Sequence, residues 1–284
     1  MATFYNRATL TYNNYVTNSN TVTGEILEVL SADKNAVGDT YSAGDELTYA
    51  VSIVNSGTAA FTGLTVTDDL GAYPFGTGTV TPLTYVDGSA TLYVNGVLAA
   101  APTVTATEPL TLTGISVPAG GNAVLIYKAR VNEFAPLAAT SEITNTAVIS
   151  GGGLSAPITV TETVTVAEAP YLTITKALSP TSVVENGQIT YTFVIQNLGN
   201  TDAVSTDNAS VTDTFDPIID ITGVTLDGVA LTSPADYTYD TATGLFTTTP
   251  GRITVPAATY VQDPVTGAIS ITPGTVTLRV VGTV

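Results

Sequence analysis

Cysteine, histidine and tryptophan are all absent from this chain of 284 residues. Without cysteine the chain can form neither a disulfide bond nor a thiolate metal site. Without histidine it lacks the commonest general base and the commonest metal ligand, which argues against Ser-His-Asp catalysis and zinc chemistry. Any unusual robustness must therefore come from packing, strand pairing or another kind of covalent bond.

Basic residues are also scarce: Lys and Arg number 7 against 24 Asp and Glu, giving a net charge of -17. This charge disfavours nucleic acid and anionic membranes as partners. No run approaches the roughly 20 apolar residues that a membrane helix needs. No signal peptide is visible at the start of the chain. We expect an acidic extracellular or cell-surface protein that spans no membrane, needs no cofactor and leaves the cell by an unconventional route or after removal of a leader.

The commonest pattern in the chain alternates with a period of two residues. The alternating runs are rich in Thr, Val, Ile and Tyr, and Gly, Pro, Asn and Asp lie between them. This pattern is typical of short strands joined by turns. It predicts an all-β fold made of two tandem immunoglobulin-like β-sandwiches, because the chain is long enough for two domains.

The two halves of the chain repeat one another. Residues 47–55 (LTYAVSIVN) match residues 189–197 (ITYTFVIQN), and a glycine follows each segment two residues later, at Gly57 and Gly199. Further matches are VTD at 66–68 with VTD at 211–213, and the hairpin signals Asn-Gly at 95–96 and Asp-Gly at 227–228. We therefore expect a first sandwich over residues 27–168 and a second over residues 169–284.

Four segments carry a resemblance to a known family: LTITKALSP from Leu172, ITYTFVIQNLG from Ile189, VTDTF from Val211 and ITNTAVIS from Ile143. In these segments the chain resembles bacterial surface repeats catalogued as the domain of unknown function number eleven. The resemblance implies an immunoglobulin-like sandwich, usually in tandem, in exported cell-surface proteins. It carries no catalytic residues. The first module departs from the family at Ser31, where the family's lysine would stand.

The N-terminus resembles a strand from the end of the first module. Residues 4–11 (FYNRATLT) align with residues 143–150 (ITNTAVIS), so that Asn6 matches Asn145 and Ala8 matches Ala147. A further stretch, residues 20–26, partly matches the strand that follows in the first module. The second module stops before its own copy of this strand. We expect residues 1–26 to be a donor segment that completes the second module of a neighbouring subunit.

Such a donor strand would present one face to its acceptor, because alternate side chains of a strand point the same way. The predicted donor residues are Phe4, Asn6, Ala8, Leu10 and Tyr12. The predicted acceptor groove is lined by Ile189, Tyr191, Phe193, Val276, Leu278 and Val280. Since donor and acceptor surfaces differ, identical copies would join head-to-tail into an open filament by β-strand addition. The expected partner is therefore another copy of the chain.

An alternative is that the N-terminus pairs with its own module and that the second module closes with fewer strands. The chain would then be a monomeric surface protein that binds carbohydrate or a host protein. Tyr73, Tyr85 and Tyr93 could provide its stacking platform. An enzyme is not expected, because no pair of carboxylates stands out as acid and base.

Two further sites are candidates. Lys176 in the first strand of the second module could form an isopeptide bond with a donated Asn6, with Asp213 or Glu185 as the neighbouring acid, as some surface sandwiches join a first-strand lysine to a last-strand asparagine. The alternative is a surface lysine and an asparagine that bonds backbone groups. Asp202 and Asp207 are weak calcium candidates without EF-hand spacing. They are expected to lie in solvated turns. Calcium-dependent assembly is a third hypothesis for the function of the chain.

Overall fold

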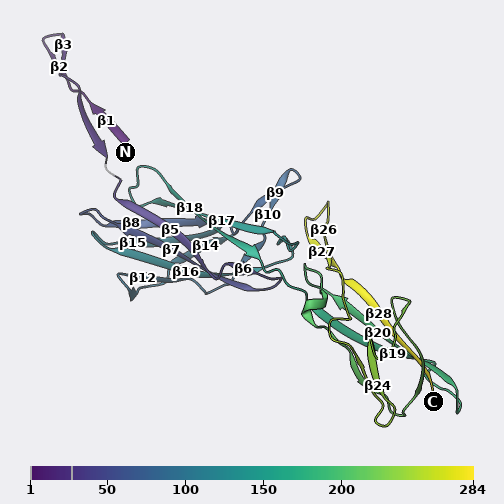
Figure 1. Ribbon diagram of the computed structural model, residues 1–284. Helices are drawn as coiled ribbons and strands as arrows, with labels where there is room; N and C mark the ends of the chain where they lie inside the picture. The colour runs from purple at the N-terminus through teal and green to yellow at the C-terminus, as the bar shows by residue number, and fades with distance from the viewer. Residues whose placement is uncertain (1, 27) are drawn as a thin grey trace. The chain divides into compact units, whose positions relative to one another are not determined.

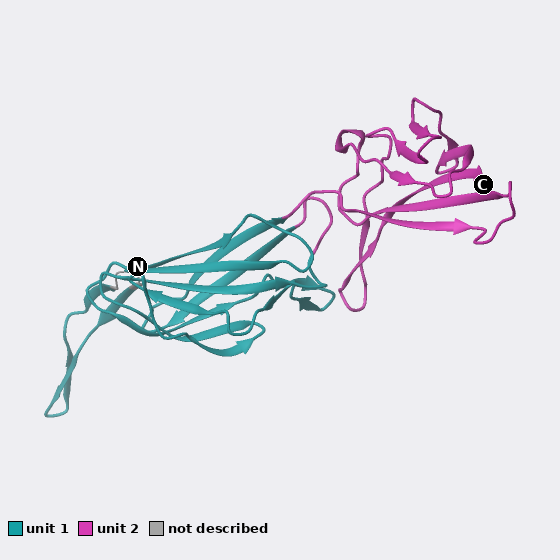
Figure 2. Ribbon diagram, turned by 90° about the horizontal axis from the view of Figure 1, so that it is seen from below, with its two compact units in different colours: residues 1–135, 142–165 teal, residues 136–141, 166–284 magenta. Residues whose placement is uncertain are grey.

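The computed structural model describes residues 2–26 and 28–284. The described chain is built from β-strands, with a single 3₁₀ turn, η1 (Ser205–Asp207), and no α-helix. It divides into two compact units: unit 1 comprises residues 1–135 and 142–165, and unit 2 comprises residues 136–141 and 166–284 (Figure 2). The all-β prediction is confirmed. The main segment of unit 2 begins at Val166, and the N-terminal segment is grouped with unit 1.

The N-terminal segment folds into a long hairpin, here called the N-terminal hairpin (residues 2–26; Figure 1). Its paired strands are β1 (Ala2–Asn6) with β4 (Val22–Ile26) and β2 (Thr9–Tyr12) with β3 (Tyr15–Asn18). Asn13 and Asn14 close it with φ values of 44° and 67°. Two left-handed residues at a two-residue turn favour a hairpin, and asparagine tolerates this conformation well. Within the described chain these four strands pair only with one another.

The sandwich of unit 1 consists of two six-stranded sheets. The first runs in the order β13-β12-β16-β7-β5, with β11 also paired to β16, and the second in the order β14-β15-β8-β17-β18-β6. A separate hairpin joins β9 (Tyr73–Phe75) to β10 (Gly78–Val80). The remaining bounds are β5 (Leu30–Val37), β6 (Thr40–Tyr41), β7 (Glu46–Asn55), β8 (Phe61–Asp68), β11 (Leu83–Tyr85), β12 (Thr91–Val94), β13 (Val97–Leu98), β14 (Thr103–Thr107), β15 (Leu110–Val117), β16 (Asn122–Val131), β17 (Glu142–Gly151) and β18 (Ile158–Val166).

Period-two alternation fixes which face of each strand of unit 1 is buried. In β7, Leu47, Tyr49, Val51 and Ile53 are buried, whereas the residues between them are more accessible. Tyr49 stacks on Tyr127 of β16 with ring centroids 5.7 Å apart. The core of unit 1 therefore lies between its two sheets.

Unit 2 has a five-stranded sheet in the order β19-β20-β28-β22-β23 and a three-stranded sheet in the order β21-β25-β24. A further hairpin pairs β26 with β27. Phe215, Phe246 and Leu278 are among the fully buried side chains of its core. The bounds are β19 (Leu172–Ser179), β20 (Gln188–Asn197), β21 (Thr212–Thr214), β22 (Asp220–Leu226), β23 (Val229–Ala230), β24 (Tyr237–Asp240), β25 (Leu245–Thr248), β26 (Thr259–Gln262), β27 (Ile269–Thr272) and β28 (Gly274–Thr283).

Strand pairing gives the correspondence between the two units. Lys34 on β5 lies opposite Val51 on β7, and Lys176 on β19 lies opposite Phe193 on β20. Because Val51 and Phe193 occupy the same place in the sequence repeat, Lys34 is the counterpart of Lys176. The same number of residues separates each lysine from its strand partner. The prediction that Ser31 stands in the place of the first-strand lysine is therefore wrong, because Lys34 occupies that place.

The second sheets correspond as well. Asp68 on β8 pairs with Leu110 on β15, and Asp213 on β21 pairs with Phe246 on β25. β21-β25-β24 is therefore the counterpart of β8-β15-β14. In unit 1 this sheet continues through β17 and β18, but the described part of unit 2 contains no counterpart of these two strands.

Candidate functional site

A buried ion pair links the two sheets of unit 1. Lys34 Nζ lies 2.6 Å from Asp68 Oδ2, and both side chains are 0% exposed. Tyr127 Oη donates to the same carboxylate oxygen at 2.5 Å. Asp68 Oδ1 accepts a hydrogen bond from the backbone N–H of Leu70 at 3.0 Å. Both carboxylate oxygens are thus engaged inside the core.

Asn145 on β17 completes this cluster. Its side chain is buried, and its Nδ2 lies 3.5 Å from Tyr127 Oη. Its Oδ1 forms no hydrogen bond with any residue that the structure describes. A buried carbonyl oxygen without a donor costs about 1–3 kcal/mol of folding free energy. The lysine–aspartate–asparagine cluster is therefore an expensive arrangement for a β-sandwich core.

Burial shapes the electrostatics of the cluster. Loss of solvation lowers the pKa of Lys34, although the neighbouring Asp68 carboxylate acts in the opposite direction. Burial raises the pKa of Tyr127, and the charge of Asp68 adds to this effect. The Lys34 ammonium also lies 5.0 Å from the centre of the Tyr49 ring, within range of a cation–π contact. Burial thus shifts Lys34 towards the neutral amine, and the ion pair with Asp68 opposes this shift.

Unit 2 repeats the lysine–aspartate pair but leaves it open. Lys176 Nζ lies 2.5 Å from Asp213 Oδ2, yet the two side chains are 42% and 17% exposed. The Lys176 ammonium lies 4.5 Å from the centre of the Tyr191 ring, as Lys34 lies over Tyr49. Of the two acids predicted to accompany Lys176, Asp213 is its ion-pair partner. Glu185 is exposed in a turn.

In unit 1 the sheet that carries Asp68 continues beyond β8 through β17 and β18. β17 pairs with β8 from Ala147, opposite Asp68, and it pairs with β18 along its other edge. Its inward side chains are buried: Ile143, Asn145, Ala147 and Ile149. In unit 2, β21 pairs with β25 on one edge and with no described strand on the other. The lysine–aspartate pair of unit 2 is accessible at this open edge.

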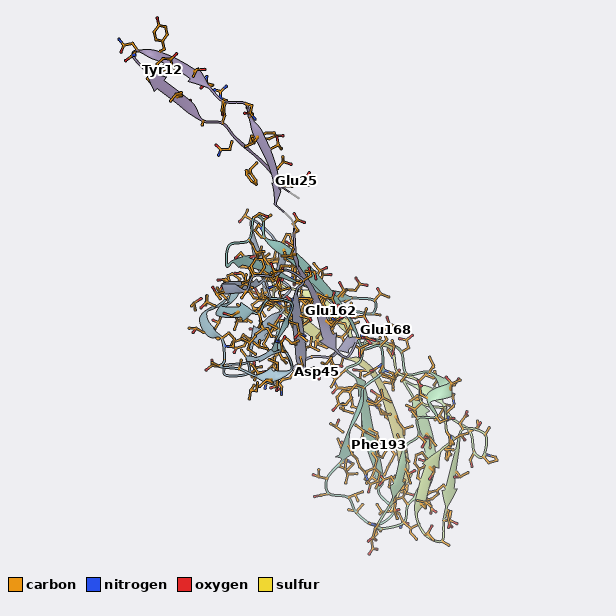
Figure 3. All side chains as sticks on the ribbon, turned by 90° about the vertical axis from the view of Figure 1, so that its left-hand side faces the viewer. Tyr12, Glu25, Asp45, Glu162, Glu168 and Phe193 are labelled. Carbon is orange, nitrogen blue, oxygen red and sulfur yellow. The ribbon has the colours of Figure 1, made fainter. Side chains whose placement is uncertain are left out.

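The predicted donor residues all lie on the N-terminal hairpin with exposed side chains: Phe4, Asn6, Ala8, Leu10 and Tyr12. Phe4 is 53% exposed and Leu10 is 60% exposed. Tyr12 lies near the closed end of the hairpin and Glu25 towards its other end (Figure 3). Asn6 faces Val22 in the β1–β4 ladder. The predicted donor segment is thus a hairpin of paired strands rather than a single strand, and residues 20–26 contribute to its second half.

The predicted acceptor residues lie on β20 and β28. Tyr191 is partly buried against the core of unit 2. The other five are buried within it: Ile189, Phe193, Val276, Leu278 and Val280. Phe193 lies between the sheets of this unit (Figure 3). β20 pairs on both edges with β19 and β28, and β28 pairs with β20 and β22. The predicted groove is therefore not open at these residues, because the side chains are already buried and both edges of β20 and β28 are paired. An added strand could form ladder hydrogen bonds at the edge of β21 that is unpaired in the described chain.

The sequence reasoning missed the site in unit 1. Lys34, Asp68, Tyr127 and Asn145 come from four different strands, and no short motif connects them. The signal that could have revealed them was the spacing of the repeat. That spacing puts Lys34 in the place of Lys176 and Asp68 in the place of Asp213.

The calcium candidates have structural contacts. Asp202 Oδ1 accepts a hydrogen bond from Ala257 N at 2.7 Å, and Asp207 Oδ2 accepts one from Val204 N at 2.7 Å. The described residues contain no group of three or more acidic side chains that could hold a metal ion. Each aspartate therefore orders a loop through the backbone.

Of the tyrosines predicted to form a stacking platform, Tyr85 is buried in the core of unit 1, contrary to its predicted exposure, and Tyr93 is partly buried. Tyr73 is half-buried and donates its hydroxyl hydrogen to the carbonyl of Phe134 at 2.7 Å. The rings of Tyr73 and Tyr85 are committed to the fold of unit 1. Across the part of the chain that the structure describes, no helix combines the length and apolar character required to cross a membrane.

Comparisons with known proteins find likeness only among solved structures. No protein-family model matches the chain, and no curated protein matches it. The pilus backbone protein RrgB of Streptococcus pneumoniae is 13% identical with a TM-score of 0.36, covering 86% of this chain and 55% of that one. BcpA, the major pilin subunit of Bacillus cereus, is 14% identical with a TM-score of 0.36, covering 96% and 73%. A C-terminal fragment of a Streptococcus agalactiae major pilin is 12% identical with a TM-score of 0.35, covering 87% and 91%. The chain thus spans about half of RrgB, and these are likenesses of fold.

Proposed function

We propose that this chain is the structural subunit of an extracellular or cell-surface filament, in which the N-terminal hairpin of one copy completes unit 2 of the next. The observation that carries the proposal is the contrast between the two lysine–aspartate pairs. The pair in unit 1 is 0% exposed in a sandwich whose sheet includes β17 and β18, whereas the pair in unit 2 is 42% and 17% exposed beside the edge of β21 that is unpaired in the described chain. The N-terminal hairpin supplies strands of the kind that unit 2 lacks.

The register of unit 1 defines how the hairpin would dock. Ala147 lies opposite Asp68 in the β17–β8 ladder, so its sequence counterpart Ala8 would lie opposite Asp213. Asn6 would then take the place of Asn145, close to Lys176. Phe4 and Leu10 would take the places of Ile143 and Ile149, which are buried in unit 1.

Docking would be driven by the burial of apolar side chains and by new ladder hydrogen bonds. Burying Phe4 and Leu10 should contribute roughly 1.5–3 kcal/mol each. Each new ladder hydrogen bond adds about 1 kcal/mol. These gains are set against an association cost of roughly 4–15 kcal/mol, so several ladder bonds and both apolar residues are required. Because the two surfaces differ, repeated docking generates an open filament.

The same register supports a covalent closure of the joint. Docking would give Lys176 and Asp213 the carboxamide of Asn6 as a neighbour, in the arrangement that Lys34, Asp68 and Asn145 have within unit 1. We propose that Lys176 of one copy forms an isopeptide bond with Asn6 of another. This bond depends on the docking described above, because Asn6 lies on the N-terminal hairpin.

The test is negative-stain electron microscopy of the purified chain and three variants. Filaments are expected from the unaltered chain and from Thr11→Asp, which places a charge on the outward face of the hairpin. None are expected from a chain lacking residues 1–26 or from Leu10→Asp, which puts the charge on the docking face. Filaments formed without residues 1–26 would refute the proposal. Compact monomers in every sample would favour the monomeric binding module instead.

The covalent closure has a separate readout. After boiling in detergent, filaments of the unaltered chain should run as a ladder of linked copies on a denaturing gel. Lys176→Arg should still form filaments that dissociate into single chains, because arginine keeps the charge but does not attack a carboxamide. Filaments that dissociate fully without the substitution would remove the bond from the proposal and leave the docking intact.

A further inference from the structure

Unit 1 brings together a primary amine, a carboxyl group and a carboxamide in its core. Lys34 comes from β5 in one sheet, and Asp68 and Asn145 come from β8 and β17 in the other. None of the three residues is more than 1% exposed. Hydrogen bonds connect the three residues by way of Tyr127. Lys34 Nζ and Tyr127 Oη both donate to Asp68 Oδ2, and Asn145 Nδ2 contacts Tyr127 Oη.

An ion pair alone does not account for this cluster. A buried ion pair is seldom more stable than apolar side chains of the same size, because both charges must lose their water. Here the cost is increased by Asn145 Oδ1, which has no hydrogen-bond donor among the described residues. A carboxamide whose oxygen lacks a donor, linked through Tyr127 to a desolvated amine and an acid, supplies the groups required for acyl transfer.

We propose that Lys34 and Asn145 form an isopeptide bond within unit 1, with Asp68 as the group that moves the protons. The bond would join β5 of one sheet to β17 of the other. Unlike the joint between copies, it involves residues of a single unit. It therefore stands or falls independently of filament formation.

The step balances without another reactant. Lys34 passes one ammonium proton to Asp68, and the lone pair of the neutral amine attacks Asn145 Cγ while Asp68 gives that proton to Oδ1. A second proton leaves Nζ and reaches Nδ2 by way of Asp68. The Cγ–Nδ2 bond then breaks, ammonia departs, and the proton on Oδ1 returns to Asp68 as the carbonyl reforms. The products are a secondary amide, ammonia and the neutral acid, and no group is oxidised or reduced.

The surroundings suit each part of this step. The attacking amine must be neutral, and loss of solvation lowers the pKa of Lys34. Asp68 is fixed by Leu70 N on one oxygen and by Tyr127 on the other, so it stays next to Nζ. The Tyr127 hydroxyl also contacts Asn145 Nδ2, which holds the carboxamide against the cluster.

The test is mass spectrometry of the full chain after denaturation and digestion with trypsin. With the bond, no cleavage follows Lys34, and residues 8–128 stay joined to residues 131–176, at a total mass lower by one ammonia molecule. Without it, a free peptide of residues 8–34 appears, and that result in the unaltered chain would overturn the proposal. A link between Lys176 and Asn6 would instead block cleavage after Lys176 and join residues 1–7 to residues 131–252, so the two bonds are distinguishable.

Variants separate the roles of the residues. In Asp68→Asn the link should not form, because an amide cannot carry the proton. No ammonia should then be lost, and digestion should release the free peptide 8–34. Lys176→Arg is the matched control, and it should leave the link between Lys34 and Asn145 unchanged. If Asp68→Asn formed the link as completely as the unaltered chain, Asp68 would not be the proton carrier.

Discussion

Removing the carboxylate of Asp68 should destabilise unit 1 far more than removing that of Asp213 destabilises unit 2. In Asp68→Ala the buried Lys34 ammonium loses its counter-ion, and Tyr127 Oη and Leu70 N lose their acceptors. Breaking a fully buried ion pair by deleting one partner costs about 3–5 kcal/mol. In Asp213→Ala the affected lysine is 42% exposed, and water can solvate it. An exposed pair is worth about 0–1 kcal/mol.

The assay is hydrogen exchange followed by mass spectrometry, which reports the opening free energy of each unit separately. Every measurement is made on chains that also carry Asn145→Ala, because that change prevents the proposed isopeptide bond and isolates the ion pair. Asp68→Ala should accelerate exchange of the slowest amides of unit 1 by about 100-fold or more, since each 1.4 kcal/mol is a factor of about ten. Asp213→Ala should accelerate exchange in unit 2 by about fivefold at most.

The comparison can refute the reasoning in two ways. Equal effects of the two substitutions in monomeric protein would mean that burial does not determine how much each ion pair stabilises its unit. A small effect of Asp68→Ala would mean that water or a rearranged side chain replaces the carboxylate at no great cost.

Two further predictions concern unit 2 and the repeated glycines. Asp236→Asn should weaken unit 2 at neutral pH but not in strong acid: hydrogen bonds from Thr232 and the ion pair with Arg252 lower the pKa of Asp236 from 3.8, so its stabilisation is present above pH 3.8 and is lost as the pH falls through the lowered value. Urea unfolding at several pH values would measure this, and an equal loss at every pH would contradict it. Gly199→Ala should cost more than Gly57→Ala in thermal unfolding, because the added Cβ would meet a backbone oxygen at 2.1 Å in the first case and a valine methyl group at 2.7 Å in the second. Backbone yields less readily than a side chain, so overpacking at Gly199 should cost at least about 1–3 kcal/mol.

The repeated glycines also illustrate what local sequence can predict. The pattern Asn-x-Gly recurs because the side-chain oxygens of Asn55 and Asn197 accept a hydrogen bond from the N–H two residues later, at 2.9 Å in both units. Such contacts are local, and so is the alternation that buries every second residue of β7 and β20. Strand positions and the repeat of two sandwich modules could therefore be predicted from the sequence.

The sequence by itself determined the all-β architecture, the repeat and the absence of thiol and imidazole chemistry, because these depend on composition and on periods of a few residues. Only the tertiary structure decided that Lys34, Asp68, Tyr127 and Asn145 meet in one core, because they lie on four strands that are far apart in the chain. It also decided that the N-terminal segment is a hairpin, that β21 has an edge unpaired among the described strands, and that β20 and β28 are paired on both edges. Strand order and edge availability depend on long-range pairing, and local side-chain patterns do not encode it.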